Sequence, residues 1–361
     1  MQDIGRFVEL ELGSRGFEEF TDLARTSIES IDRSSSIEHL KPAWDPAVER
    51  YNGEQKTILN EQEIRQLKPI ELQPLKDGLP IVAIDASTLE LGETPYGALY
   101  AIRGTAVSRE SEKYHYSRLG PLLFHIKTGE NRVINGNPAA HFKLALMNTG
   151  GGAMNAYREL LTVFETMLKT SAAKKYSDAI LLWDGSLTVP AIEGETRAFR
   201  MLLELARKRR NRIVGISKKT QLFLLQGMAD LMRGYRTPCL IDINHMIQKT
   251  QRLLLMGNIY VAKLAHDGLP FRLDVDRELP EMERIITVER IIGNDLTQDG
   301  YPETLRLAHI LSKFNAAEVI GMHRFLDENY GFRVMEYPSI RRILFGPFAG
   351  NHSLEPDISL C

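Results

Sequence analysis

The chain has 361 residues, of which 43% are hydrophobic and 25% are charged. This composition is typical of a globular protein and excludes a wholly disordered, collagen-like or low-complexity chain. The formal net charge is −2, from 45 basic and 47 acidic residues, so a nucleic-acid surface would need local clustering of positive charge. Two cysteines are too few for a disulfide framework, and we see neither an apolar leader nor a run of about 18 apolar residues. We therefore expect a cytoplasmic protein without a membrane segment.

The first 79 residues have a polar, helical pattern that prolines and an Asn-Gly pair interrupt. We interpret 1–79 as an N-terminal helical extension that serves packing or dimerisation, because we recognise no chemical motif in it. Buried-strand patterns begin directly after this segment. We predict a main domain over 80–325 and a C-terminal tail over 326–361.

The main domain opens with three strand patterns that only short loops separate, which is typical of an antiparallel meander. They cover residues 81–84, 98–107 and 114–126. Helical patterns and short buried-strand patterns then alternate, at 153–170, 179–183, 193–210, 213–216 and 239–243, before a hairpin-like pair at 259–276. This order predicts an α/β fold with a ribonuclease H-like mixed sheet and flanking helices, and not a doubly wound nucleotide-binding fold.

Two of these strand patterns end in the same way, with a carboxylate, a small residue and a serine. Asp85 follows the apolar run 82–84, and Asp184 follows the run 181–183. Neighbouring parallel strands lie about 4.8 Å apart, so the two carboxylates would share a small volume, where like charges repel unless a cation lies between them. Oxygen ligands favour Mg²⁺ or Mn²⁺, and two such ions about 3.5–4 Å apart can promote phosphodiester hydrolysis. A carboxylate after a strand is also a common turn former, so it is the pairing of the motifs that favours a metal site.

The helical pattern 153–170 offers a third carboxylate. Glu159 and Glu165 lie on opposite borders of its apolar stripe when each residue is advanced by about 100°. Either glutamate can lean over the sheet edge and complete a metal site, and either can equally be a solvated border residue. Periodicity does not choose between them.

A tyrosine and a histidine mark the start of a further helical pattern at 302–328. Tyr301 precedes Pro302, which suits a first helical position, and His309 lies just over two turns inside the helix. His309 falls outside the apolar stripe, as surface histidines do. The same position also suits a histidine that faces a wet cleft as a metal ligand or proton donor.

Basic residues cluster around the predicted strand at 213–216. The run 207–210 would lie at a helix C-terminus, where cations are favourable for the helix dipole. Lys218 and Lys219 come just after the strand and are better placed to contact phosphates, so we predict them as DNA-binding residues.

Four blocks of the sequence resemble, in the same order, the NurA nucleases of DNA double-strand break repair. They are Ala83-Ile84-Asp85-Ala86-Ser87, Leu181-Leu182-Trp183-Asp184-Gly185-Ser186-Leu187, Gly215-Ile216-Ser217-Lys218-Lys219-Thr220, and Gly300-Tyr301-Pro302 with Ala308-His309. The resemblance covers about residues 80–315. The first block has Ala86 where the family more often has glycine, and the segment 1–79 matches nothing that we recognise.

The resemblance implies a ribonuclease H-like fold and Mn²⁺-dependent DNA cleavage, by 5′-to-3′ exonuclease and single-strand endonuclease action, with Mg²⁺ as the alternative ion. It also implies a homodimer that works with a HerA-type hexameric helicase in DNA end resection. Carried over by position, Asp85 and Asp184 match the family's metal-binding aspartates, while Tyr301 and His309 match its C-terminal active-site pair. The family's helix-borne glutamate falls on 153–170, where the spacing to Asp184 favours Glu165. The implied metal ligands are Asp85, Glu165, Asp184 and His309, with Tyr301 as a further catalytic residue.

Two other functions stay open. A non-catalytic, nuclease-like module that anchors a DNA translocase would account for the polar helical extension and the near-neutral charge. An actin-like ATPase shares this type of sheet and holds ATP phosphates with Asp-Gly and Ser/Thr loops, but we see no second glycine-rich phosphate loop and no Walker A sequence. DNA cleavage and ATP binding are the measurements that separate the three.

Overall fold

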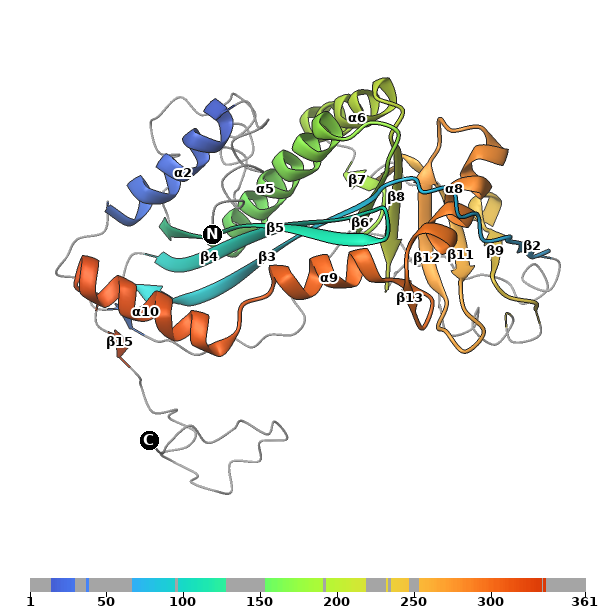
Figure 1. The fold of residues 1–361 in the computed structure, drawn as a ribbon. Coiled ribbons are helices and arrows are strands. Elements are labelled where there is room, and N and C mark those ends of the chain that lie inside the picture. Colours follow the sequence, from blue (N-terminus) through green and yellow to red (C-terminus); the bar gives the residue numbers. More distant parts are fainter. Residues whose placement is uncertain are drawn as a thin grey trace.

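The computed structural model describes residues 14–29, 37–38, 67–94, 97–127, 153–190, 193–218, 232, 235–246, 253–332 and 334–335. In this part of the chain, one large mixed sheet carries helices on both faces (Figure 1). None of the helices described is both long and apolar enough to cross a membrane.

The large sheet has eleven strands. Nine of them follow the order β15-β1-β3-β6-β8-β12-β11-β9-β2, while β4 pairs with the other edge of β3 and β5 pairs with β4. Their bounds are β1 (Ile37–Glu38), β2 (Ile70–Glu71), β3 (Ile81–Thr94), β4 (Gly97–Glu110), β5 (Lys113–Lys127), β6 (Ile180–Asp184), β8 (Arg212–Ser217), β9 (Cys239–Asp242), β11 (Gly257–Lys263), β12 (Phe271–Asp276) and β15 (Val334–Met335). Two small antiparallel pairs join β7 (Thr188–Pro190) to β10 (Leu253–Leu255) and β13 (Thr297–Gln298) to β14 (Tyr301–Pro302).

The predicted fold class is confirmed by the strand order. Strands β3, β4 and β5 form an antiparallel meander, and β6 and β8 then join the free edge of β3 in parallel. The order β5-β4-β3-β6-β8, with β4 antiparallel to the other four, is that of a ribonuclease H-like sheet. The stretches 81–84 and 180–183 are buried, because helices cover both faces of the parallel strands, and this explains their continuous apolar sequence.

Helices α5 and α6 lie on one face of these strands, and α9 and α10 lie on the other (Figure 1). The α-helices are α2 (Ser14–Glu29), α5 (Ala153–Lys175), α6 (Glu193–Lys208), α8 (Glu281–Asn294), α9 (Glu303–Ser312) and α10 (Ala316–Tyr330). Side chains along β3 alternate between the two faces: Ile81 and Ala83 pack in the core with α8 and α9, whereas Ile84 packs with α5. This alternation decides which helix meets each functional side chain.

The main domain takes in residues from both flanking segments that we predicted. Strand β2 falls within the predicted extension 1–79, yet it pairs with β9, and Leu72 beside it packs in the largest core cluster. At the other end, α10 continues through the predicted boundary at residue 325, and β15 pairs with β1. Edge strands need partners or cover, and these short strands supply it at both ends of the sheet.

The helix predicted over 302–328 is two helices. Helix α9 ends at Ser312, and α10 begins after Asn315, whose side chain accepts a hydrogen bond from the Glu318 N–H. The Glu318 carboxylate in turn accepts from the Asn315 N–H, which completes a capping box. The Asn-x-x-Glu signal for this helix start is present in the sequence, within the apolar periodicity that suggested one long helix.

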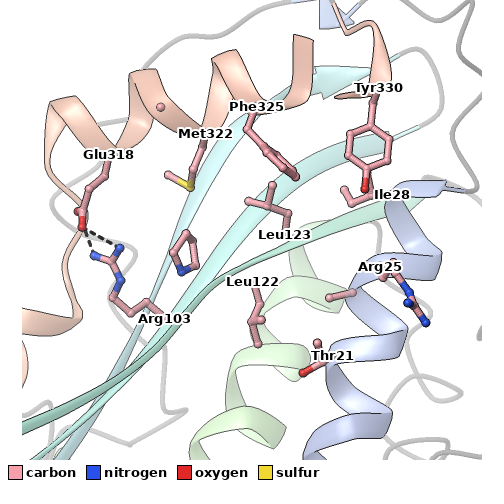
Figure 2. Close-up of a pocket in the computed structure, with 13 residues that line it drawn as sticks. Thr21, Arg25, Ile28, Arg103, Leu122, Leu123, Glu318, Met322, Phe325 and Tyr330 are labelled. Carbon is pink, nitrogen blue, oxygen red and sulfur yellow. Dashed lines mark hydrogen bonds and ion pairs between the residues drawn. The ribbon is translucent and has the colours of Figure 1, made fainter. Parts of the chain in front are cut away.

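A hollow of about 600 Å³ lies between α2, β5 and α10 and is lined mainly by apolar side chains (Figure 2). At one end, Arg103 donates hydrogen bonds of 2.8 and 3.0 Å to the carboxylate of Glu318. This contact lowers the pKa of Glu318 to about 2. None of the predicted site residues lines the hollow, so it is separate from the site described next.

Candidate metal centre

The two aspartates predicted from the sequence lie side by side. The register pairs Ile84 of β3 with Trp183 of β6, so Asp85 and Asp184 are the next residues on two neighbouring parallel strands. Our expectation that β3 ends at Asp85 was wrong, because residues 85–94 continue to pair with β4. It is the neighbouring strand β6 that ends at this point, at Asp184, while β3 continues to Thr94. Asp85 therefore lies beside the end of β6.

Both carboxylates project from the face of the sheet that α9 covers. Asp85 continues the series Ile81 and Ala83, and Asp184 continues the series Ile180 and Leu182, all of which pack in the core cluster that includes α9. The site therefore lies between the end of β6 and the middle of α9. The strand period of two places these side chains on one face without any special turn.

His309 of α9 completes a group of three metal-binding side chains. One ligand atom each of Asp85, Asp184 and His309 lies within 4.8 Å of the other two. The His309 Nδ1 atom is 2.9 Å from Oδ2 of Asp85 and 3.3 Å from Oδ2 of Asp184. The hydrogen bonds to Asp184 and Asp85 raise the pKa of His309 above its usual value, although burial acts in the opposite direction. The protonated form of this histidine is therefore favoured beside the two carboxylates.

Asp85 is held from two further sides. Its Oδ1 atom accepts a hydrogen bond of 2.9 Å from the Ala86 N–H, and its Oδ2 atom accepts one of 3.1 Å from the Ser312 hydroxyl. Ser312 and His309 are three residues apart on α9, so they present their side chains from the same face of that helix. One helix therefore supplies two contacts to the same carboxylate.

Asp184 also pairs with Lys218. The Lys218 Nζ lies 3.0 Å from Oδ2 of Asp184, and the lysine side chain keeps 41% of its surface exposed. Burial alone would raise the pKa of Asp184, but the His309 hydrogen bond and the Lys218 ammonium outweigh it and hold the pKa below its usual value. We predicted Lys218 as a phosphate-binding residue, and the structure places it inside the acidic group. Lys219 lies outside the described residues.

Tyr301 closes the inner side of the site. It is 92% buried, and the Lys218 Nζ lies 5.1 Å above its ring centroid, in cation–π range. Burial, and then the charges of Asp184 and Asp85, raise the pKa of the Tyr301 hydroxyl well above its usual value, so the hydroxyl stays protonated. The hydroxyl oxygen has no hydrogen-bond partner among the residues that the structure describes. It is therefore a buried donor within electrostatic range of the two carboxylates.

Helix α9 is fixed at its start by a carboxylate that we did not predict. Asp295 is buried, and its Oδ2 atom accepts a hydrogen bond of 3.0 Å from the Thr304 N–H in the first turn of α9. Its Oδ1 atom accepts a hydrogen bond of 2.8 Å from the Tyr114 hydroxyl of β5. A carboxylate at a helix N-terminus satisfies free N–H groups and favours the helix dipole. In the sequence, an acidic residue nine positions before Thr304 gives no local sign of this contact.

Glu165 lies on α5, the helix that covers the opposite face of the sheet. It is buried, and its carboxylate accepts a hydrogen bond of 3.2 Å from Lys169, whose ammonium lies 5.0 Å from the ring centroid of Trp183. The group of three described above does not include Glu165. That Glu165 is a fourth ligand stays a prediction. Glu159 is on the same helix, and its side chain is not among those described.

The comparisons with known proteins give structural similarities only. No family model matches the chain, and no curated protein matches its sequence significantly. Among solved structures, the chain is similar to the NurA nuclease from Sulfolobus solfataricus, with 14% identity over 94% of this chain and 100% of that one, and a TM-score of 0.43. It is also similar to endonuclease V from Streptomyces avermitilis, with 12% identity over 71% and 92% of the two chains and a TM-score of 0.33. Endonuclease V from Bacillus subtilis gives 13% identity over 75% and 95%, with a TM-score of 0.32.

Proposed function

We propose that this protein is a metal-dependent nuclease that cleaves DNA at the site formed by Asp85, Asp184 and His309. One observation carries the proposal: three side chains from distant parts of the chain, all of metal-binding type, bring their ligand atoms within 4.8 Å of one another. The sequence motifs that contain these residues resemble NurA nucleases, which is an independent reason for the same activity.

The donor atoms suit a divalent cation of the Mn²⁺ type. Two carboxylates that lie close together repel each other. Here Lys218, which contacts Asp184, and His309, which contacts both aspartates, reduce that repulsion. A divalent ion would replace part of this neutralisation, because carboxylate oxygens suit Mg²⁺ and Mn²⁺, and an imidazole nitrogen shifts the preference toward Mn²⁺. We propose Mn²⁺ as the ion, with Mg²⁺ as the alternative. Glu165 is proposed as an additional ligand from the sequence resemblance alone, since it lies on α5 and outside the group of three.

The ion, when bound, would polarise the scissile phosphate and lower the pKa of water beside it. The chain's own residues have separate tasks. Asp85 and Asp184 hold the cation, and Ser312 keeps the Asp85 carboxylate in place. Lys218 keeps its ammonium partly exposed beside the carboxylates, so it can also contact a phosphate oxygen. Tyr301 keeps the proton on its buried hydroxyl, which we propose donates a hydrogen bond to a group bound in the site.

We propose the finer details from the sequence resemblance. They are 5′-to-3′ exonuclease and single-strand endonuclease activity, a role in end resection at double-strand breaks, a homodimeric state, and cooperation with a HerA-type hexameric helicase. The order of the four sequence blocks supports them. Light scattering of the purified protein tests the dimer, and co-purification with a HerA-type helicase tests the partner.

The deciding experiment is a cleavage assay on end-labelled linear and single-stranded DNA with Mn²⁺, Mg²⁺ or EDTA. We expect cleavage with Mn²⁺, none with EDTA, and none by the Asp85→Asn variant under any condition. A wild-type protein that binds a translocase but cuts no DNA with any divalent ion would favour the non-catalytic module instead.

The actin-like alternative loses support from the position of the first motif. Asp85, Ala86 and Ser87 lie within a continuous strand, so they do not form a phosphate-binding turn. The Ser87 hydroxyl donates a hydrogen bond to the main-chain carbonyl of Ser312. An ATP titration followed by calorimetry tests this alternative directly, and we expect no binding.

A further inference from the structure

We propose that Gly215 and Asp274 are positioning residues that set the metal affinity of the site by fixing the turn after Asp184. The inference rests on the proposed function, because it concerns how one of the proposed ligands is held. Neither residue belongs to the group of Asp85, Asp184 and His309. Both contact the turn at 185–187, where the chain leaves β6.

The turn begins directly after the metal-binding carboxylate. Gly185 has a φ of +126°, a region that residues with a Cβ rarely adopt, and its N–H donates a hydrogen bond of 2.9 Å to the carbonyl of Ile216 on β8. The same register places Asp184 opposite Ile216. Two residues beyond Ile216, Lys218 pairs with Asp184. A shift of this turn relative to β8 would therefore move Asp184 away from the groups that surround it.

Gly215 leaves the space that the turn occupies. A Cβ on Gly215 would lie 2.5 Å from the carbonyl oxygen of Gly185, and 3.3 Å from both the Leu187 nitrogen and the Ser186 carbonyl carbon. All three are main-chain atoms, so no side-chain rotation can relieve the collision. The strand β8 is otherwise regular at this position, which means that glycine is required here by the turn and not by the strand.

Asp274 holds the far side of the turn. Its Oδ2 atom accepts a hydrogen bond of 2.9 Å from the Leu187 N–H. The carboxylate is 1% exposed and pairs with the equally buried Arg272, whose Nη2 also donates a 2.9 Å hydrogen bond to the Thr188 hydroxyl. A buried ion pair often contributes little net stability. We infer that this pair fixes geometry through its remaining hydrogen bonds. Here they are directed at Leu187, the last residue of the turn, and at Thr188, the residue after it.

The test compares variants that differ only in how the turn is held. Gly215→Ala adds the colliding methyl group, and Gly321→Ala is its control, because a Cβ on Gly321 meets nothing within 4 Å. The second comparison removes the ion pair from both proteins: Arg272→Met/Asp274→Leu leaves the Leu187 N–H without an acceptor, whereas Arg272→Met/Asp274→Asn keeps an amide oxygen for it. Mn²⁺ binding is measured from the electron paramagnetic resonance signal of the free ion, and folding by thermal unfolding in EDTA.

We expect Gly215→Ala and Arg272→Met/Asp274→Leu to bind Mn²⁺ about ten- to a hundredfold more weakly than the wild type, as residues behind metal ligands typically do when changed. Gly321→Ala should bind Mn²⁺ as tightly as the wild type. Arg272→Met/Asp274→Asn should bind it within about threefold of the wild type, because the amide oxygen still accepts from the Leu187 N–H. Folded Gly215→Ala with wild-type affinity would overturn the inference. If Gly215→Ala does not fold, equal affinities of the two double variants would overturn it.

The failure of the proposed function gives a different result. A wild-type protein that binds no Mn²⁺, or an Asp85→Asn variant that binds it equally well, would remove the metal centre and the inference with it. A wild type that binds Mn²⁺ and loses it on Asp85→Asn, together with unchanged binding by the turn variants, would overturn the inference alone.

Discussion

The Nδ1 atom of His309 lies 2.9 Å from Oδ2 of Asp85, although the two residues are 224 positions apart in the chain. The contact exists because β3 runs past the end of β6, and α9 crosses the place where the two strands part. The same atom is 3.3 Å from Oδ2 of Asp184, so one imidazole meets both carboxylates.

Asp184→Asn should lower DNA cleavage by at least about a thousandfold, because the amide keeps the size of the side chain but removes the charge that holds a divalent cation. Circular dichroism and thermal unfolding should show a folded protein. The matched control is Asp267→Asn, since Asp267 also pairs with a histidine, His266, at 2.9 Å but is exposed. Full Mn²⁺-dependent cleavage by Asp184→Asn would contradict the assignment of the site.

Tyr301→Phe should lower the rate of DNA cleavage without lowering the stability of the protein. The hydroxyl is buried without a hydrogen-bond partner among the described residues, so its removal should leave the free energy of unfolding unchanged or raise it by up to about 1 kcal/mol. Cleavage should fall by about tenfold to a hundredfold, because the site loses a positioned donor. Chemical denaturation and initial rates measure the two effects. A loss of stability without a loss of rate would show that the hydroxyl serves the fold.

Lys218→Met should lower the cleavage rate and raise the pKa of Asp184, since the ammonium is one of the groups that holds that pKa down. The change removes a charge and keeps the length of the side chain. Lys113→Met, at an exposed position at the start of β5, is the control for a general loss of positive charge. Equal effects of the two changes on cleavage would mean that Lys218 acts only through long-range attraction of DNA.

The metal-free protein should become less stable as the pH rises through the pKa of His309. That pKa is raised in the folded state by Asp184 and Asp85, so the protonated form is favoured by folding. The resulting stabilisation is fully present below the usual imidazole pKa of about 6.5 and is lost above it, as the pH passes the raised value. Urea unfolding in EDTA between pH 5 and 9 measures this, and His309→Gln should remove that part of the pH dependence. An unchanged profile in His309→Gln would contradict the prediction.

Glu165→Gln should weaken Mn²⁺ binding by about ten- to a hundredfold, and Glu159→Gln should have no effect. Both variants keep a side chain of the same size on α5. Calorimetric titration with Mn²⁺ gives the comparison. The reverse result would assign the role to Glu159, and no effect of either change would leave the site with Asp85, Asp184 and His309 as its ligands.

The sequence predicted the order of the five central strands, β5-β4-β3-β6-β8, and it named Asp85, Asp184 and His309, whose ligand atoms the structure brings together. The continuous apolar runs before Asp85 and Asp184 identify buried strands, because only a strand covered on both faces excludes polar residues from every position. The meander followed by alternation then fixes the neighbours of β3. The periodicity placed His309 outside the apolar stripe of its helix, which fits a surface residue as well as one that faces a wet cleft, and only the sequence resemblance favoured the second.

Only the tertiary structure decided how these residues are arranged. Periodicity does not show that β6 stops where β3 continues, that Lys218 turns back onto Asp184, or that Ser312 and Asp295 hold Asp85 and α9 in place. Nor does it show that Gly215 makes room for the turn after Asp184. These contacts join residues from separate elements. A local sequence pattern indicates whether a side chain is buried and in which type of element it lies. Which partner that side chain contacts depends on how the sheet and its helices pack.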